Sequence, residues 1–226
     1  ELLEELAHQI RGEGGRAGVY PCDVGDRDQV LAALAKCQEE LGNVDLLIAN
    51  AGISMNTRVE AFDVEAIERV IRINLLGAIY ATEGVLSGML QRRSGQIVAV
   101  SSIAGFAGLP MSAAYSASKG GMINFFESLR MDLRGSGVAV TVITPGFVKT
   151  PLTSHNRHKM AFLMELEPAV ERMVRAIKER RKSLAFPRRL AVVAWAARLL
   201  PRPLYDRLVG RMDRRKSPEA GGPASD

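Results

Sequence analysis

Cysteine and histidine are scarce in this chain, and their scarcity limits the kinds of site that it can carry. The 226 residues include two cysteines and three histidines. Cys22 and Cys37 show no Cys-x-x-Cys spacing, and His155 and His158 fall in a polar stretch. This pattern argues against a disulfide framework and against a zinc site. We therefore expect no metal, and we expect a reducing compartment such as the cytoplasm.

The carboxyl-terminal part lacks a hydrophobic run long enough to cross a membrane. Its most apolar stretch, Leu190–Leu200, has eleven residues, whereas a bilayer needs about twenty. Positive charge gathers around this stretch: residues 172–216 contain 15 Lys and Arg against 3 Asp and Glu, a net charge of +12, which leaves −7 for the remainder of a chain whose total is +5.

Residues 188–213 are therefore predicted to form a basic amphipathic helical segment. Trp195 with flanking arginines is typical of a helix that binds an anionic membrane surface. The alternative is that this helix covers the substrate pocket or a subunit interface. Nucleic acid is not expected as a partner, because the basic stretch lacks interleaved aromatic residues. The composition of residues 214–226 predicts a disordered tail.

The rest of the chain alternates between helical and strand patterns. With 47% hydrophobic and 24% charged residues, it can bury one sizeable core. Near-continuous apolar strands between amphipathic helices indicate an α/β fold with a parallel sheet covered on both faces. We expect helices over residues 1–12, 27–41, 63–93 (two helices meeting near Asn74), 113–135 and 169–181, and strands over 17–20, 44–49, 96–100, 138–143 and 184–186.

Tyr115 and Lys119 form the most informative pair, because a helix places residues four apart on one face. An ordinary tyrosine has a pKa of about 10. A unit positive charge ~4 Å away contributes about 4 kcal/mol at an effective dielectric near 20, enough to bring the pKa of the phenol toward neutrality. We therefore expect Lys119 to lower the pKa of Tyr115 and to make it an acid/base.

Other polar residues follow the predicted strands. Ser101-Ser102 end one strand thirteen residues before Tyr115, and Asn50-Ala51-Gly52 and Pro145-Gly146 end two more. In open α/β sheets, ligands bind beyond the carboxyl ends of the strands. These residues are therefore expected to line one crevice.

In this order and spacing, the motifs resemble those of the short-chain dehydrogenase/reductase family over roughly residues 1–187. The resemblance implies that Ser102, with Ser101 as the competing choice, holds the substrate oxygen. It also implies that Asn74 keeps a water in a proton relay, and that Asp23 contacts adenine. The catalytic residues implied are Asn74, Ser102, Tyr115 and Lys119, and the cofactor-binding residues implied are Asp23, Val24, Asn50, Ala51, Gly52, Tyr115, Lys119, Pro145, Gly146, Val148 and Thr150.

The family's Gly-rich pyrophosphate loop is not found in this sequence. Gly12, Gly14 and Gly15 follow a helix and precede a strand, which is the reverse of the context that binds pyrophosphate. We therefore expect a Rossmann-like doubly wound parallel sheet that lacks its first two strands, with the strand at Ala17–Tyr20 left without a partner. Such a chain is expected to bind a dinucleotide poorly on its own. The residues that separate NAD from NADP precede this sequence, so either cofactor fits.

The predicted organisation is a partial dinucleotide-binding catalytic domain over residues 1–187, the basic segment 188–213 and the tail 214–226. The predicted function is NAD(P)-dependent interconversion of an alcohol and a carbonyl. Met160, Phe162, Leu163 and Met164 suggest an apolar lid, with ordinary packing of these side chains as the alternative. This lid and the carboxyl-terminal segment favour a lipophilic substrate. A homodimer or homotetramer in the cytoplasm, with or without peripheral membrane attachment, is implied. The alternative is a non-catalytic scaffold or membrane-associated interaction protein that keeps the fold.

Overall fold

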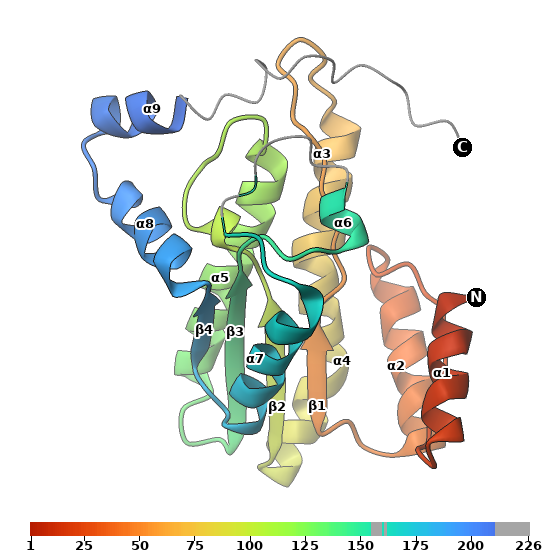
Figure 1. Cartoon of the computed structure of the whole chain (residues 1–226). Helices are drawn as coiled ribbons and strands as arrows, with labels where there is room; N and C mark the ends of the chain where they lie inside the picture. The colour runs from red at the N-terminus through yellow and green to blue at the C-terminus, as the bar shows by residue number, and fades with distance from the viewer. Residues whose placement is uncertain (155–159, 161, 211–226) are drawn as a thin grey trace.

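Parallel strands form the centre of the molecule in the computed structural model, which describes residues 1–154, 160 and 162–210. In this part of the chain the sheet has four strands in the order β1-β2-β3-β4. Helices cover both faces, as Figure 1 shows. The predicted doubly wound α/β fold is therefore confirmed. The strands are β1 (Leu46–Ala49), β2 (Gly95–Val100), β3 (Val138–Pro145) and β4 (Ser183–Phe186).

The helices follow the predicted periodicity, with ends that differ by a few residues. The predicted helix 169–181 begins earlier, at Leu166, and a short helix at Pro151–Ser154 lies where no helix was predicted. The helices are α1 (Leu2–Gly12), α2 (Arg27–Leu41), α3 (Val64–Ile71), α4 (Gly77–Arg92), α5 (Ala113–Asp132), α6 (Pro151–Ser154), α7 (Leu166–Lys178), α8 (Arg188–Arg198) and α9 (Arg202–Gly210), with a 3₁₀ turn η2 at Ile103–Gly105.

Burial on both faces explains why the central strands read as continuous apolar runs. All six residues of β2 are buried. On one face, Met89 of α4 and Phe126 of α5 pack with Ile97 and Val140. On the other face, Ala169 of α7 packs with Val98 and its neighbours. The register aligns Ala49 with Ala99 and Ala99 with Val142, so the carboxyl ends of the strands lie at one edge of the sheet.

The long helical pattern around Asn74 is one continuous helix, where a meeting of two helices was predicted. Between α3 and α4 the chain makes a π-helical turn, η1, at Arg72–Leu76. Such turns insert one residue into a helix and are frequent at functional sites. Val64–Arg92 is also the one stretch of the described residues long and apolar enough to span a membrane. Here it packs on α2, α5, β1 and β2, as a core helix does.

The segment Ala17–Tyr20, which was predicted as a strand left without a partner, does not form a strand. This segment is extended but lies outside the sheet, and no strand lies beside it among the described residues. A ladder needs a neighbouring backbone. In its absence, the Arg11 guanidinium donates to the Ala17 carbonyl at 2.9 and 3.0 Å.

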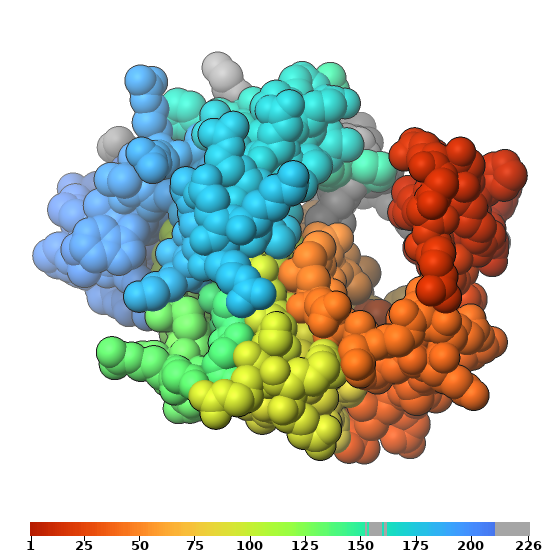
Figure 2. All heavy atoms as spheres, turned by 90° about the horizontal axis from the view of Figure 1, so that it is seen from below, coloured from red at the N-terminus to blue at the C-terminus, as the bar shows by residue number. Residues whose placement is uncertain are grey.

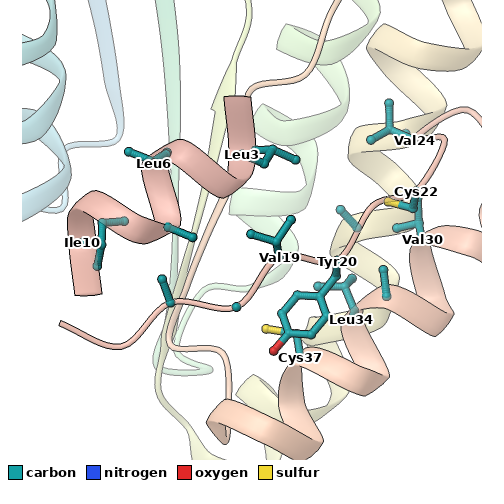
Figure 3. A pocket seen from close by; sticks show the side chains of 16 residues that line it. Leu3, Leu6, Ile10, Val19, Tyr20, Cys22, Val24, Val30, Leu34 and Cys37 are labelled. Carbon is teal, nitrogen blue, oxygen red and sulfur yellow. The ribbon is translucent and has the colours of Figure 1, made fainter. Parts of the chain in front are cut away.

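A hollow lies between this extended segment, α1, α2 and α4. Its volume is about 370 Å³, and Leu3, Leu6 and Ile10 of α1 line it from one side (Figure 3). Seen from below, an open gap separates α1 from the body of the molecule (Figure 2). None of Asn74, Ser102, Tyr115 and Lys119 lines this hollow, so the candidate site lies elsewhere.

The region predicted as an apolar lid is only partly described. Met164 packs against the core, while Phe162 and Leu163 are exposed. Met160 belongs to the described part, whereas residues 155–159 and 161 lie outside it. Residues 211–226, which include the end of the basic segment and the whole predicted tail, also lie outside the described residues.

Candidate active site

The candidate site lies where β2 ends and α5 begins. The Ser101 hydroxyl donates to the Lys119 carbonyl at 2.7 Å, which fixes α5 to the end of β2. A Cβ at Gly105 would lie 2.7 Å from the Lys119 carbonyl carbon, so only glycine lets η2 approach α5 this closely. The helix is also held at its start, where Thr57 Oγ1 accepts from the Ala114 amide at 3.3 Å. This packing brings the loop after β2 against the first turns of α5.

Tyr115 and Ser102 are brought together by this arrangement. Their side chains form a hydrogen bond, and both residues are half-buried. Burial raises the pKa of Tyr115, and the bond with Ser102 opposes that rise. Ser102 Oγ also accepts from the Ala104 amide at 3.1 Å. Ser101 is buried and bonded to α5, so the geometry favours Ser102 over Ser101 as the serine that faces a substrate.

Lys119 lies one helical turn after Tyr115 on α5 and is buried, with 3% of its surface exposed. Its ammonium donates to the Val100 carbonyl at 2.9 Å and lies 3.6 Å from Met122 Sδ. Burial lowers the pKa of Lys119 to about 8. In this structure the expected lowering of the Tyr115 pKa is therefore wrong, because the ammonium is bound to a backbone carbonyl and desolvation of the phenol is the largest effect.

Asn74 connects three elements from the buried face of the π-helical turn. Its Oδ1 accepts from the Ile53 amide at 2.8 Å, and its Nδ2 donates to the Ile53 carbonyl at 2.9 Å. Nδ2 also donates to Ser118 Oγ at 3.0 Å, and that hydroxyl donates to the Tyr115 carbonyl at 2.9 Å. These bonds show that the Asn74 amide holds the loop after β1 and the tyrosine-bearing turn of α5, and its implied role with a relay water stays a prediction.

The loop after β1 lies next to this network. A Cβ at Gly52 would lie 3.2 Å from Asn74 Oδ1 and 3.4 Å from Lys119 Nζ. Asn50 and Ala51 follow the last residue of β1 and are exposed. The prediction that the strand ends at Asn50-Ala51-Gly52 and Ser102 reach one region therefore agrees with the structure for Gly52.

The residues after β3 take a different position. The Gly146 amide donates to the Phe186 carbonyl at 2.7 Å, and a Cβ at Gly146 would lie 2.9 Å from Leu190 Cδ2 of α8 and 3.4 Å from Ile103 Cδ1. Pro145 is paired with Phe186 in the ladder. This segment therefore lies between η2 and α8, on the far side of Ser102 from β1.

Val148 and Thr150 continue that segment into the loop. Val148 pairs with Met164 in an isolated parallel bridge. Thr150 is bonded locally, since its amide donates to Thr153 Oγ1 at 3.0 Å. Both residues are half-buried.

Asp23 and Val24 contact the amino-terminal part of the fold. Asp23 Oδ1 accepts from the Gly25 amide at 2.8 Å, and the Val24 carbonyl would lie 2.6 Å from a Cβ at Gly77. These contacts attach the turn before α2 to the start of α4. The contacts do not bring Asp23 or Val24 to Tyr115, and their predicted role with adenine stays a prediction.

Ser118 and Met122 belong to the site but were not predicted. They lie three and seven residues after Tyr115, on the helix face that also carries Lys119, so helical spacing alone could have found them. The Val100 carbonyl could not have been found in this way, because its role depends on how α5 docks on β2. Within the described residues, no cluster of three or more His, Cys, Asp or Glu side chains is placed to hold a metal ion.

Comparison with known proteins agrees with this geometry. The family model for short chain dehydrogenases matches residues 1–161. An uncharacterized oxidoreductase of Myxococcus xanthus is 42% identical over 210 residues, which are 93% of this chain and 83% of that protein. Ketoacyl reductase HetN of a Nostoc species is 34% identical over 182 residues, covering 79% of this chain and 63% of that protein.

More distant relatives are also named as dehydrogenases. Human estradiol 17-beta-dehydrogenase 11 is 28% identical over 202 residues, covering 88% of this chain and 67% of that protein. A crystal structure of gluconate 5-dehydrogenase from Burkholderia cenocepacia, in complex with NADP and tartrate, has a TM-score of 0.63 and 29% identity, over 66% of this chain and 59% of that chain. The predicted family is therefore confirmed, and with it, at the level of the family, the prediction of an enzyme that uses NAD or NADP.

Proposed function

Because the chain belongs to the short-chain dehydrogenase family, we propose that it acts in an NAD(P)-dependent oxidoreductase that interconverts an alcohol and a carbonyl, with Tyr115 as the acid/base. One observation carries this proposal. The hydroxyls of Ser102 and Tyr115 are hydrogen-bonded at the carboxyl end of β2, and the buried ammonium of Lys119, one helical turn after Tyr115, is bonded to the Val100 carbonyl at the end of the same strand.

The residues beside Lys119 suit the nicotinamide end of the cofactor. The absence of a side chain at Gly52 leaves space next to Lys119 Nζ and Asn74 Oδ1, and an ammonium is a donor for ribose hydroxyls. Lys119, Asn50 and Gly52 are therefore proposed to hold that end. When bound, NAD or NADP supplies or accepts the hydride.

The chain's own residues handle the proton. Ser102 donates a hydrogen bond to the substrate oxygen and stabilises the negative charge that develops there. Tyr115 gives its phenolic proton to that oxygen, or takes it back in the opposite direction. An ordinary phenol is already protonated at neutral pH, and burial raises the pKa of Tyr115 further; the protonated form is the one needed to reduce a carbonyl. Asn74 acts as a positioning residue, since its bonds through Ser118 fix the turn that carries Tyr115.

A lipophilic alcohol or ketone is the proposed substrate. Two of the relatives are named for a ketoacyl group and for estradiol, and apolar Phe162 and Leu163 are exposed on the loop before α7. The proposal also includes a homodimer or homotetramer. Leu90 of α4 and Met131 of α5 are exposed large apolar residues on the two long helices expected at the interface. The cytoplasm is the proposed location, with peripheral attachment to an anionic membrane through residues 188–213.

Replacement of Tyr115 by Phe tests the proposed acid. Made in the full-length enzyme, the variant is expected to bind NADH or NADPH as well as the unaltered enzyme and to lose about 10²–10⁴-fold in turnover, which is the usual contribution of a general acid. Tyr20→Phe is the matched control, because it removes the same atom from a tyrosine that bonds Glu40 in the hollow beside α1. Turnover is measured with a panel of lipophilic ketones and alcohols and with both cofactors.

The same measurement separates the enzyme from the alternative of a non-catalytic scaffold or interaction protein. A scaffold would show no turnover with any substrate in the panel, and Tyr115→Phe would leave its properties unchanged. Equal turnover of Tyr115→Phe and Tyr20→Phe would rule out the role given to Tyr115.

A further inference from the structure

Helices α8 and α9, residues 188–210, form a unit with two unlike sides. The inner side carries Ala191, Tyr205 and Val209, each 8% exposed. The Tyr205 hydroxyl donates to the Gly108 carbonyl, and the Arg198 guanidinium donates to the Phe106 carbonyl at 3.5 Å. The inner side is therefore attached to the loop that runs from Ser102 to Tyr115.

The outer side of the unit carries an exposed apolar stripe. On α8 and its C-cap residue, Val192, Trp195 and Leu199 are 64%, 59% and 66% exposed, and their spacing of three and four residues places them on one face. On α9, Leu204 and Leu208 are 50% and 48% exposed and lie four residues apart. Figure 1 shows both helices beyond the carboxyl ends of β3 and β4, outside the packed layers. An apolar surface of this kind marks an interaction site.

Positive charge accompanies the stripe. Residues 188–210 contain five arginines and one aspartate, a net charge of +4; Arg198 is bonded on the inner side, and the other four arginines are exposed. Arg188 and Arg189 are exposed at the start of α8, next to Val192. None of the five arginines forms an ion pair with a carboxylate in the part of the chain that the structure describes. The surface is therefore both apolar and cationic.

This combination favours a membrane over a second copy of the chain. In a two-fold symmetric dimer the same patch meets itself, so the arginines of one copy would face those of the other at a cost in electrostatic energy. An anionic lipid surface complements both properties, since its headgroups attract the arginines and its acyl chains accept Trp195 and Leu199.

We propose that the outer face of α8–α9 is a docking surface for an anionic lipid membrane. Because the inner face is bonded to the loop beside Ser102, docking brings the candidate active site to the membrane surface. This consequence rests on the proposed function: a lipophilic alcohol or ketone dissolved in the bilayer would enter the site from the side of α8.

Trp195 provides a direct test, because it is the only tryptophan in the chain. The intact protein is mixed with phosphatidylcholine vesicles that contain about 30% phosphatidylserine, or with phosphatidylcholine alone, since anionic lipid should supply the attraction. The expected result is a blue shift of the emission and quenching by brominated lipids with the anionic vesicles only. No shift with anionic vesicles would overturn the proposal.

Charge-removing variants make the test specific. Arg188→Gln with Arg189→Gln is expected to lower the partition coefficient about 30-fold, or about 5-fold for each basic residue. Arg172→Gln with Arg175→Gln is the matched control, because it removes the same charge from exposed positions on α7. Equal partition of the two double variants would contradict the proposal.

Self-association is the other outcome that would overturn it. A shift of the Trp195 emission that depends on protein concentration without vesicles would assign this face to a second copy. The binding assay involves no turnover, so its result is separate from that of Tyr115→Phe. Membrane binding together with full turnover of Tyr115→Phe would remove the proposed acid and leave the docking surface intact.

Discussion

The buried ammonium of Lys119 should make the stability of the fold depend on pH in an unusual direction. Lys119 is 3% exposed, and its bonds go to a carbonyl and a thioether, with no carboxylate pairing it among the described residues. Burial lowers its pKa from 10.5 to about 8. A difference of about 2.5 pKa units corresponds to roughly 3 kcal/mol, so the charged form of Lys119 destabilises the fold by that order of magnitude.

Whether the free energy of unfolding rises or falls with pH depends on which state, folded or unfolded, binds the proton more tightly. Between the folded pKa of about 8 and the unfolded value of 10.5, the unfolded chain holds more protons than the folded chain. The free energy of unfolding therefore rises with pH across this window. Below the folded pKa the whole destabilisation is present, and above the unfolded pKa it is absent.

Lys119→Met isolates this contribution, because methionine keeps much of the side-chain length and carries no charge. Urea unfolding of both proteins is measured from about pH 7 to about pH 10, and the other titrating groups cancel in the difference. The advantage of Lys119→Met over the unaltered protein should shrink by roughly 3 kcal/mol toward high pH. The lost bond to the Val100 carbonyl shifts the difference by a constant and leaves its slope unchanged.

Lys182→Met serves as the control. Lys182 is exposed, so the difference in free energy of unfolding between this variant and the unaltered protein should not change comparably with pH. The prediction is contradicted if the difference in free energy of unfolding between Lys119→Met and the unaltered protein stays constant with pH or grows. Either result would mean that the Lys119 ammonium is solvated or paired in solution.

Three further predictions concern the network around the site. Asn74→Leu leaves the amide and carbonyl of Ile53 without their side-chain partner and should lower the free energy of unfolding by about 2–4 kcal/mol, as measured by urea unfolding. Gly105→Ala places a methyl group 2.7 Å from the α5 backbone and should cost about 1–3 kcal/mol, whereas Gly108→Ala, with nothing within 4 Å, should be nearly neutral by the same assay; equal costs would contradict the close approach. Tyr205→Phe removes the bond to the Gly108 carbonyl and should cost about 1 kcal/mol, with a larger change in KM than in kcat in steady-state assays.

The central part of the fold could be predicted because its local and global preferences agree. Both β2 and β3 are covered by helices on both faces, so nearly every residue in them is buried, and each reads as an apolar run. The start of α2 could also be predicted from sequence, because Asp26 is an N-cap residue: its side chain accepts from the amides of Asp28 and Gln29. Patterns of this kind depend on one element and the layer that covers it.

Features that depend on a neighbour far along the chain could not be read in this way. The Ala17–Tyr20 segment has strand composition, and the family resemblance predicted that it would lack a partner; because a strand exists only where another backbone pairs with it, composition alone could not decide its state. The position of the Lys119 ammonium is a second case. Spacing places Lys119 beside Tyr115, but docking of α5 against β2 provides the Val100 carbonyl, which binds the ammonium instead.

The two sides of the candidate site differ in how they are held, and this difference has a functional consequence. On the side of α5, Ser101, Asn74 and Ser118 tie the helix to β2 and to the loop after β1 through buried hydrogen bonds. On the opposite side, Leu46 and Ile48 of β1 are 42% and 46% exposed, and the hollow beside α1 opens there (Figure 3). The groups proposed to move the proton are thus positioned by the packing of α5 on β2. Changes in α1 or α2 should therefore alter dinucleotide affinity while leaving the Ser102–Tyr115 bond intact.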